Sequence, residues 1–423
     1  MSIDWRARVL QAVDDNSEVM LTALTDLVRA PSVSGSDVEN SAQGNLAEAL
    51  VREALDVDYW PIPLDDMLVA PDFPGVEVSR TEAWGLVGVL ASGGDGPRLM
   101  FNGHIDVVPP GDRTAWSDDP FAGRVRGGAL YGRGACDMKA GLAAAWWAVR
   151  ALRRSGVPLR GDVLLTSVQG EEDGGLGAYA LLARGWRADA CVIPEPTSLG
   201  LVTANAGALT FRLRVRGLAT HASRRTDGVS AIEKFWPVWR ALHDLECRRN
   251  RKVHPLFARW PIAYPISIGT VRSGDWVSSV PDLLVAEGRL GVALGEPVEH
   301  ARAELEHAIC HACADDPWLD RHPVEVQWWG GQFAPGEVPA NSDLPDHVRA
   351  AHAGVTGDDT PVWGAPYGSD LRLLTGKGGI PTVQYGPGDA ALAHAPDESV
   401  PLREVVTCAR VLALLAVDYC GVS

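Results

Sequence analysis

The sequence lacks an apolar run of membrane-spanning length, and it has fewer basic than acidic side chains. A membrane-spanning helix needs about 20 consecutive apolar residues, and we expect no membrane segment in this chain. The 38 Lys and Arg residues stand against 54 Asp and Glu residues, which gives a net charge of −16. Because nucleic acids and anionic membranes bind basic patches, this imbalance argues against both as partners.

Cysteine is scarce, and the N-terminus lacks the pattern of a secretory leader. The 7 cysteines are an odd, scattered set, which does not suit a disulfide framework and favours a reducing compartment. The first residues, Met1–Arg6, show no basic region followed by an apolar run, so we expect no signal peptide. Together these features predict a cytoplasmic protein.

The pattern of elements predicts two domains, as the length of 423 residues also suggests. In residues 1–205, and again in 333–423, predicted strands alternate with helices, which indicates a mostly parallel sheet flanked by helices. In residues 206–332 the character changes: Leu209–Val215 alternates apolar and polar side chains, as a half-exposed strand does. The β-α-β-β-α-β order there predicts an inserted ferredoxin-like α+β domain. The fold class is therefore α/β with an α+β insertion.

Histidine and carboxylate side chains come just after apolar runs that we predict to be buried strands. In an open α/β sheet, ligands and chemistry gather at the carboxyl ends of the strands. Two imidazoles and four carboxylates meeting there would form a ligand set for two divalent metals, with one carboxylate to spare. These positions are His104, Asp137, Glu171, Glu172, Glu195 and His394. The leading interpretation is a metal-assisted hydrolase.

His104 and Asp106 lie two residues apart at one of these strand ends. Side chains at that spacing share a face of a strand, so Asp106 can hydrogen-bond one imidazole nitrogen while the other holds a metal. Such carboxylate–His–metal relays are common in zinc sites. The alternative is an ordinary strand-end histidine beside a solvated aspartate.

Each carboxylate in the set also has a structural alternative. Asp137 stands in a glycine-rich turn entering a helix, where it could bridge two metals or simply cap the helix. Of the adjacent Glu171 and Glu172, one could bind metal while the other acts as general base on a water; the alternative is a solvated pair. Glu195 lies between two prolines, which suits a rigid ligand loop and an ordinary loop equally.

The loop that precedes His394 contains Gly386 and Gly388. Glycines leave backbone N–H groups accessible, so both are candidates for binding a substrate carboxylate. A plain surface loop is the alternative.

These motifs resemble the M20 metallopeptidase family, which includes acetylornithine deacetylases, succinyl-diaminopimelate desuccinylases, aminoacylases and glutamate carboxypeptidases. The resemblance follows the family order across nearly the whole chain. It implies a zinc-peptidase-like catalytic domain formed by 1–205 and 333–423, with 206–332 as a lid. The strings that carry it are Gly103-His-Ile-Asp106, Gly134-Ala-Cys-Asp137-Met-Lys, Glu171-Glu172, Glu195-Pro-Thr and His394.

The resemblance also implies a role for each site residue. One metal would be held by His104, Asp137 and Glu195, and a second by Asp137, Glu172 and His394. Glu171 would be the general base and Asp106 the partner of His104. The peptide bond after the bridging aspartate, Asp137–Met138, would be cis.

Four further segments resemble substrate-facing parts of the family. His221 looks like the lid histidine that, in dimeric members, reaches a neighbouring active site and stabilises the oxyanion. Ser278 stands where the family often has an asparagine that touches substrate. Arg289 of the lid, and Asp370 and Arg372 in Gly368-Ser-Asp-Leu-Arg372, could bind a substrate carboxylate or form structural salt bridges.

The resulting hypothesis is a di-zinc hydrolase, with cobalt or manganese as other candidate metals, that removes the acyl group from an N-acyl amino acid. A dipeptidase or carboxypeptidase that uses the same groups on a short peptide is the second hypothesis. The chain could also be a catalytically silent binding homologue, or a cysteine-dependent enzyme built on Cys136. The lid histidine implies a homodimer that pairs through the lid.

Overall fold

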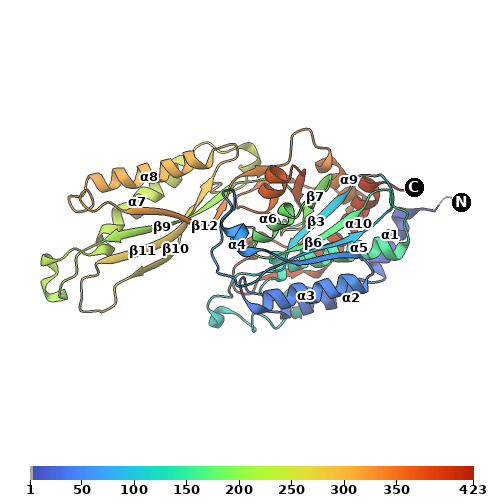
Figure 1. Cartoon of the computed structure of the whole chain (residues 1–423), viewed down its shortest axis with the longest axis horizontal. Helices are drawn as coiled ribbons and strands as arrows, with labels where there is room; N and C mark the ends of the chain where they lie inside the picture. The colour runs from blue at the N-terminus through green and yellow to red at the C-terminus, as the bar shows by residue number, and fades with distance from the viewer. Residues whose placement is uncertain (1–2) are drawn as a thin grey trace. The chain divides into compact units, whose positions relative to one another are not determined.

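A computed structural model describes residues 3–423 (Figure 1), which divide into two compact units. The first unit comprises the chain up to Ala204, Glu337–Trp363 and Ser369–Ser423; the second comprises Asn205–Gly336 and Gly364–Gly368. The insertion predicted from the sequence, 206–332, falls inside the second unit, which also contains one short segment from later in the chain. Within residues 3–423, no helix is both long and apolar enough to span a bilayer.

The first unit is built on a mixed nine-stranded sheet in the order β1-β2-β6-β3-β7-β15-β8-β13, with β14 paired to β8. The strands are β1 (Asp56–Pro61), β2 (Trp84–Leu90), β3 (Leu99–His104), β6 (Val163–Val168), β7 (Ala190–Ile193), β8 (Leu201–Asn205), β13 (Gly336–Glu337), β14 (Val362–Ala365) and β15 (Thr382–Gln384). The central strands β6, β3, β7 and β15 pair in parallel. The β1–β2, β2–β6 and β15–β8 pairs are antiparallel. The parallel pairing thus lies at the centre, where the predicted site residues follow strands.

Helices cover both faces of this sheet, which confirms the α/β class with a helix-flanked sheet. Adjacent strand residues point to opposite faces, and Leu164 and Leu165 of β6 accordingly belong to different apolar clusters. The larger cluster contains α1 (Trp5–Asp14), α2 (Ser17–Arg29), α3 (Asp37–Arg52), α5 (Ala140–Ser155), α9 (Leu344–Thr356) and α10 (Leu402–Cys420). On the other face lies α6 (Leu176–Ala183). Helices α1 and α10, from opposite ends of the chain, both pack on α5 (Figure 1).

The remaining elements of the first unit are short. A second sheet has the order β16-β5-β4. Its strands are β4 (Arg124–Arg126), β5 (Ala129–Tyr131) and β16 (Ser399–Pro401). Helix α4 (Leu64–Leu68) is followed by residues 69–83, which form no helix or strand before β2. Glu77, Val78 and Arg80 of this irregular stretch contact Asp173, in the loop that follows β6.

The second unit has the expected β-α-β-β-α-β order. Its elements are β9 (Gly207–Arg216), α7 (Ala231–Arg249), β10 (Ile266–Ser273), β11 (Leu283–Val292), α8 (Val298–Ala314) and β12 (Glu325–Phe333). The antiparallel sheet has the order β10-β11-β9-β12. Alternate residues of β9, from Leu209 to Val215, are buried in one cluster with side chains of α7 and α8, which gives this unit a core of its own.

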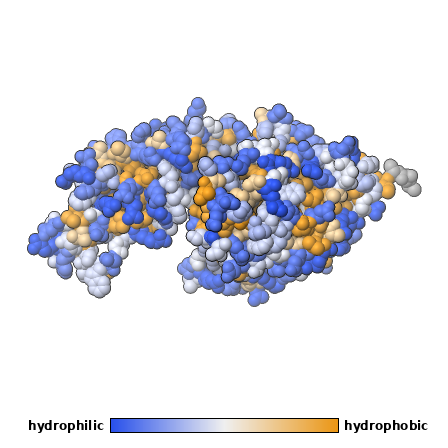
Figure 2. Space-filling view, viewed as in Figure 1, coloured by the Kyte–Doolittle hydropathy of each residue, from blue (hydrophilic) through white to orange (hydrophobic). Residues whose placement is uncertain are grey.

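The surface seen in Figure 2 is largely hydrophilic, with small apolar patches between charged and polar side chains. This distribution is expected, because most large apolar side chains are buried in the interior clusters of the two units. Among the exposed exceptions are Trp236 and Trp239 on α7 and Trp276 in the β10–β11 connection.

Candidate metal centre

The topology brings the predicted ligands to one edge of the sheet. His104 is the last residue of β3, Glu171 and Glu172 follow β6, and Glu195 follows β7. Because β6, β3 and β7 are parallel neighbours, their carboxyl ends meet at the same edge. Asp137 arrives from the turn that leads into α5.

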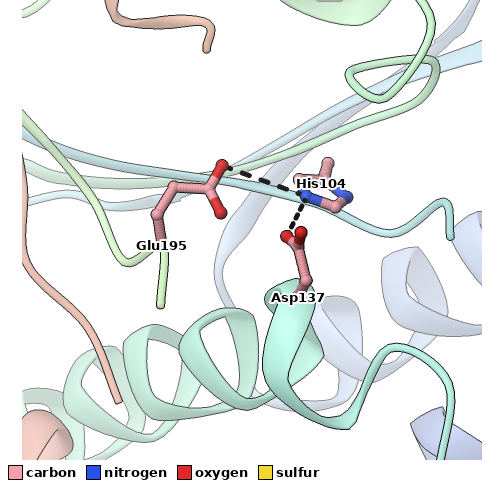
Figure 3. Close-up of side chains that lie close together, drawn as sticks. All are labelled: His104, Asp137 and Glu195. Atoms are coloured by element: carbon pink, nitrogen blue, oxygen red, sulfur yellow. Dashed lines mark hydrogen bonds and ion pairs between the residues drawn. The ribbon is translucent and has the colours of Figure 1, made fainter. Parts of the chain in front are cut away.

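The first cluster consists of His104, Asp137 and Glu195 (Figure 3). Nε2 of His104 lies 3.2 Å from Oδ1 of Asp137 and 3.9 Å from Oε1 of Glu195. The side chains of His104 and Glu195 are almost fully buried, and that of Asp137 is largely so. All three point into one small space from a strand end, a helix start and a loop.

The second cluster consists of Asp137, Glu172 and His394. Nε2 of His394 lies 3.1 Å from Oε2 of Glu172 and 3.5 Å from Oδ2 of Asp137. Asp137 therefore turns one carboxylate oxygen to each histidine, as a bridging ligand does. The His394 side chain is 54% exposed, so this half of the site is open to solvent.

The donor atoms of each cluster fit a divalent metal. Within each group the candidate ligand atoms all lie within 4.8 Å of one another. Two ligand atoms on one tetrahedral zinc, each about 2 Å from it, lie roughly 3.3 Å apart, close to the separations around His104 and His394. Imidazole and carboxylate are also the donors that zinc accepts.

Charge within the clusters also favours cations. Glu172 raises the pKa of His394 to about 11, against the effect of burial. Burial disfavours protonation of His104, but Asp137 and Glu195 outweigh it and raise the pKa of that imidazole. Burial also opposes ionisation of Asp137, yet the two histidines lower the pKa of its carboxyl. Without metal, protons on the imidazoles balance the carboxylates, and a metal would replace those protons.

Glu171 lies beside these clusters but belongs to neither ligand group. Its side chain is buried, and burial, reinforced by the charge of Asp370, raises the pKa of its carboxyl. A carboxylate whose pKa is raised and which does not bind the metal is suited to accept and return a proton. Burial, reinforced by Asp137, likewise raises the pKa of Glu195.

The structure corrects the expected contact between Asp106 and His104. Nδ1 of His104 lies 2.9 Å from the backbone oxygen of Asp106, whereas the Asp106 carboxylate is 3.8 Å away. The Nδ1–H of the imidazole therefore donates to a carbonyl, and Nε2 is the nitrogen that can bind a metal. The Asp106 carboxylate instead accepts the backbone N–H groups of Glu171 at 3.3 Å and Glu172 at 3.4 Å, and the Ser34 hydroxyl at 2.9 Å.

Glu398 holds the turn that carries Asp137, and nothing in the sequence pattern indicated this role. Its Oε1 accepts the backbone N–H groups of Cys136 at 2.8 Å and Asp137 at 3.1 Å. Its Oε2 pairs with Arg133 at 2.5 Å, and both side chains are buried. The expected cis peptide bond between Asp137 and Met138 is present.

The glycines near His394 do not offer the expected open donors. The backbone N–H of Gly386 donates to the Thr197 hydroxyl at 2.9 Å. That of Gly388 donates to the Glu404 carboxylate, also at 2.9 Å. Both donors are thus used inside the protein rather than left open, and a role of the two glycines towards a substrate stays a prediction.

Asp370 and Arg372 are buried and make hydrogen bonds inside the protein, and their roles towards a substrate stay predictions. Arg372 donates to the backbone carbonyls of Ser369 at 2.8 Å and Gly174 at 2.7 Å. The Asp370 carboxylate has no exposed surface, accepts from Asn102 at 3.5 Å, and has its pKa raised by burial to about 6. It acts on the site through the charge it adds near Glu171.

The other three predicted residues lie in the second unit. Nδ1 of His221 is 2.8 Å from the Ser223 hydroxyl, and His221 forms a β-bridge with Ser279. The Ser278 carbonyl accepts the backbone N–H of Ala222. Arg289 lies on β11 with its guanidinium over the Phe333 ring. Their roles towards a substrate stay predictions.

Comparisons with known proteins show the family to which this chain belongs. Residues 100–418 match the model of peptidase family M20/M25/M40. The chain is 40% identical over 410 residues to a succinyl-diaminopimelate desuccinylase of Gluconacetobacter diazotrophicus, covering 93% of this chain and 95% of the relative. It is 26% identical over 437 residues to an N-formyl-4-amino-5-aminomethyl-2-methylpyrimidine deformylase of Halalkalibacterium halodurans, covering 97% of each.

A solved structure supports the fold. The dipeptidase Dug1p from Saccharomyces cerevisiae superposes with a TM-score of 0.78, covering 98% of both chains at 16% sequence identity. The resemblance drawn from the motifs is confirmed by the family match and by the fold. This chain belongs to peptidase family M20/M25/M40.

Proposed function

We propose that this protein is a metal-dependent amidohydrolase that removes an acyl group from the amino nitrogen of an N-acyl amino acid. The observation that carries the proposal is the pair of His–carboxylate clusters sharing Asp137, with buried Glu171 beside them and outside both ligand groups. Hydrolysis needs an activated water, a general base and a polarised carbonyl. Metals held by the two clusters would activate the water and polarise the carbonyl, and Glu171 would be the base.

Zinc is the proposed metal in both clusters. His104, Asp137 and Glu195 would hold one ion, and Asp137, Glu172 and His394 the other. Such a pair, when bound, lowers the pKa of water and polarises the scissile carbonyl. The Asp106 carbonyl keeps the proton of His104 on Nδ1, so that Nε2 stays available as a donor.

Glu171 moves the proton in the proposed reaction. Its carboxylate accepts a proton from the attacking water and returns it to the nitrogen of the leaving amine. Desolvation raises the pKa of this carboxyl, which strengthens it as a base, whereas nearby cations would lower the pKa.

Relatives favour a deacylase over a peptidase. Two of them are named for removing a succinyl and a formyl group from a nitrogen. The fold similarity to a dipeptidase, at 16% identity, supports the architecture and leaves hydrolysis of short peptides as the second candidate activity.

We further propose that the second unit is a lid that pairs two chains in a cytoplasmic homodimer. Trp236 and Trp239 on α7 are 62% and 47% exposed, which is typical of a surface that a partner covers. In such a dimer His221 would stabilise the oxyanion in the partner's site, with Arg289 and Ser278 contacting the substrate.

The proposed activity is tested by measuring amine release from a substrate panel. The panel contains N-acetyl, N-formyl and N-succinyl amino acids, an N-formyl aminomethylpyrimidine, and dipeptides, each given to zinc-loaded protein. Release from one acyl class, but not from dipeptides, is the expected result. Cleavage of dipeptides alone would move the protein to the peptidase alternative, and no cleavage by protein that holds two metals would contradict the proposal.

A further inference from the structure

A buried ion-pair network surrounds the loop that carries Glu171 and Glu172. It consists of Glu39, Arg80 and Asp173, which we call the loop clamp. None of the three belongs to a candidate metal group. Their side chains are 2%, 3% and 5% exposed, respectively. Burying three charged groups next to a site loop requires a structural reason, because charges are seldom buried unless they are paired.

The clamp holds both ends of the loop Gly170–Gly174. At the first end, Oε1 of Glu39 accepts the backbone N–H of Gly170 at 3.1 Å. At the other end Asp173 is itself a clamp residue, and Nη1 of Arg80 donates to its Oδ2 at 2.9 Å. Arg80 also reaches Oε2 of Glu39 through Nε at 3.4 Å. The Arg80 guanidinium therefore pairs with both carboxylates: Asp173 at one end of the loop, and Glu39, which contacts the other end.

The clamp also ties the loop to the irregular stretch before β2. Oδ2 of Asp173 accepts the backbone N–H groups of Glu77 at 3.1 Å and Val78 at 2.9 Å. The backbones meet closely here, because a Cβ atom added to Gly174 would lie 1.9 Å from the Gly75 carbonyl oxygen. Close packing of the two backbones and charge-assisted hydrogen bonds thus hold the loop in place.

Loss of Arg80 would leave two buried carboxylates without their only cation in the clamp. Both carboxylates are almost fully buried, and Arg80 is the cation that pairs with each of them. Removing one partner of a buried ion pair leaves an uncompensated charge. The loop would then lose the contacts through which Arg80 joins Asp173 to Glu39.

We propose that Arg80 is a positioning residue for catalysis: through Asp173 and Glu39 it holds the loop that presents Glu171 and Glu172. The inference rests on the proposed roles of those two glutamates. Asp106 fixes the backbone of the two glutamates themselves, and the loop clamp fixes the ends. A misplacement of about 1 Å in such a loop is enough to lower a rate by roughly 10²-fold.

The test compares Arg80→Met and Arg80→Lys with the control Arg150→Met. Arg150 pairs with Glu53 in the same unit, and both side chains are largely buried; the pair joins α5 to the end of α3, and neither residue belongs to a candidate metal group. For each variant we would measure amide hydrogen exchange in Gly170–Gly174, zinc affinity, thermal stability, and kcat and KM separately.

Arg80→Met is expected to speed exchange in this loop by about tenfold or more, to weaken binding of the second zinc, and to lower kcat by roughly 10–100-fold with little change in KM. Arg80→Lys should recover part of kcat, since one ammonium can pair with a carboxylate but does not reproduce the planar fork. Arg150→Met should lose stability without these local effects.

Two results would overturn the inference. One is an Arg80→Met variant with wild-type loop exchange and wild-type kcat; the other is a kcat loss no larger than that of Arg150→Met at equal loss of stability. If the wild type hydrolyses nothing in the panel, the proposed function fails by itself. Exchange and zinc affinity would then still decide whether Arg80 holds the loop.

Discussion

At the scale of single residues, the Asp137 carboxylate lies between the imidazoles of two histidines. One carboxylate oxygen faces His104 and the other faces His394, so this one side chain raises the proton affinity of both imidazoles. Glu171 belongs to neither ligand group, and its carboxyl is desolvated. The ligands and the proposed base are therefore distinguishable by experiment.

Metal binding should release protons at neutral pH. The pKa of His394 in the metal-free protein is raised to about 11, so the imidazole holds its proton at neutral pH, whereas a metal needs the neutral form. Calorimetry in two buffers of different ionisation enthalpy should detect at least one proton released, and affinity should fall as the pH is lowered. His394→Ala should release fewer protons; an equal release would contradict the assignment.

Glu171→Gln should separate turnover from metal binding. Loss of a general base costs typically 10²–10⁴-fold in rate, and Glu171 belongs to neither candidate ligand group, so zinc content should stay at the wild-type level. Metal analysis and kcat on the same preparation give both values. Glu48→Gln, at an exposed site on α3, is the control that should leave both unchanged. Normal turnover in Glu171→Gln would remove Glu171 from the mechanism.

At the scale of elements, buried carboxylates fix the loops that follow the strands. Asp106 holds the Glu171–Glu172 backbone, and Glu398 holds the turn before α5. Each loop is therefore fixed by a side chain distant in sequence, which explains how short, glycine-rich segments keep ligands in place.

Glu398→Gln tests this arrangement at the Asp137 turn. The amide keeps a hydrogen-bond acceptor but leaves the charge of buried Arg133 uncompensated, so we expect a loss of about 3 kcal/mol in the free energy of unfolding and roughly 10–100-fold weaker zinc binding. Denaturant unfolding and zinc titration measure the two effects. Unchanged zinc affinity would show that Glu398 does not position Asp137.

The sequence predicts the metal ligands better than it predicts the residues that hold those ligands in position. His104, Glu172 and Glu195 can be placed because each follows an apolar strand, and the ends of parallel strands meet. The contact of Asp106 is predicted through the wrong atom, because spacing gives the face of a strand but not whether a carbonyl or a carboxylate makes the contact. Arg80 carries no local signal, since its partners lie 41 and 93 residues away.

At the scale of the whole molecule, each unit has an apolar interior of its own, and the candidate metal groups of the first unit contain no described residue from the second. The proposed contribution of the second unit is made across a dimer. His221 is the residue that tests this, because its role depends on reaching a partner's site.

Co-expression of His221→Ala with Glu171→Gln should restore activity that each variant lacks alone. In a mixed dimer, one site has its own Glu171 and receives His221 from the other subunit. With random pairing, about one quarter of all sites would be complete. Tagged purification of the mixed dimer followed by an amine-release assay measures this; no recovery in a verified mixed dimer would contradict the role in trans.

The most direct test of the central claim is amine release from the best N-acyl amino acid while zinc is added stepwise to chelator-stripped protein. We expect no release from stripped protein and a rise in activity that is complete at two zinc ions per chain. Release by stripped protein at the rate of the zinc-loaded form would contradict a metal-dependent reaction.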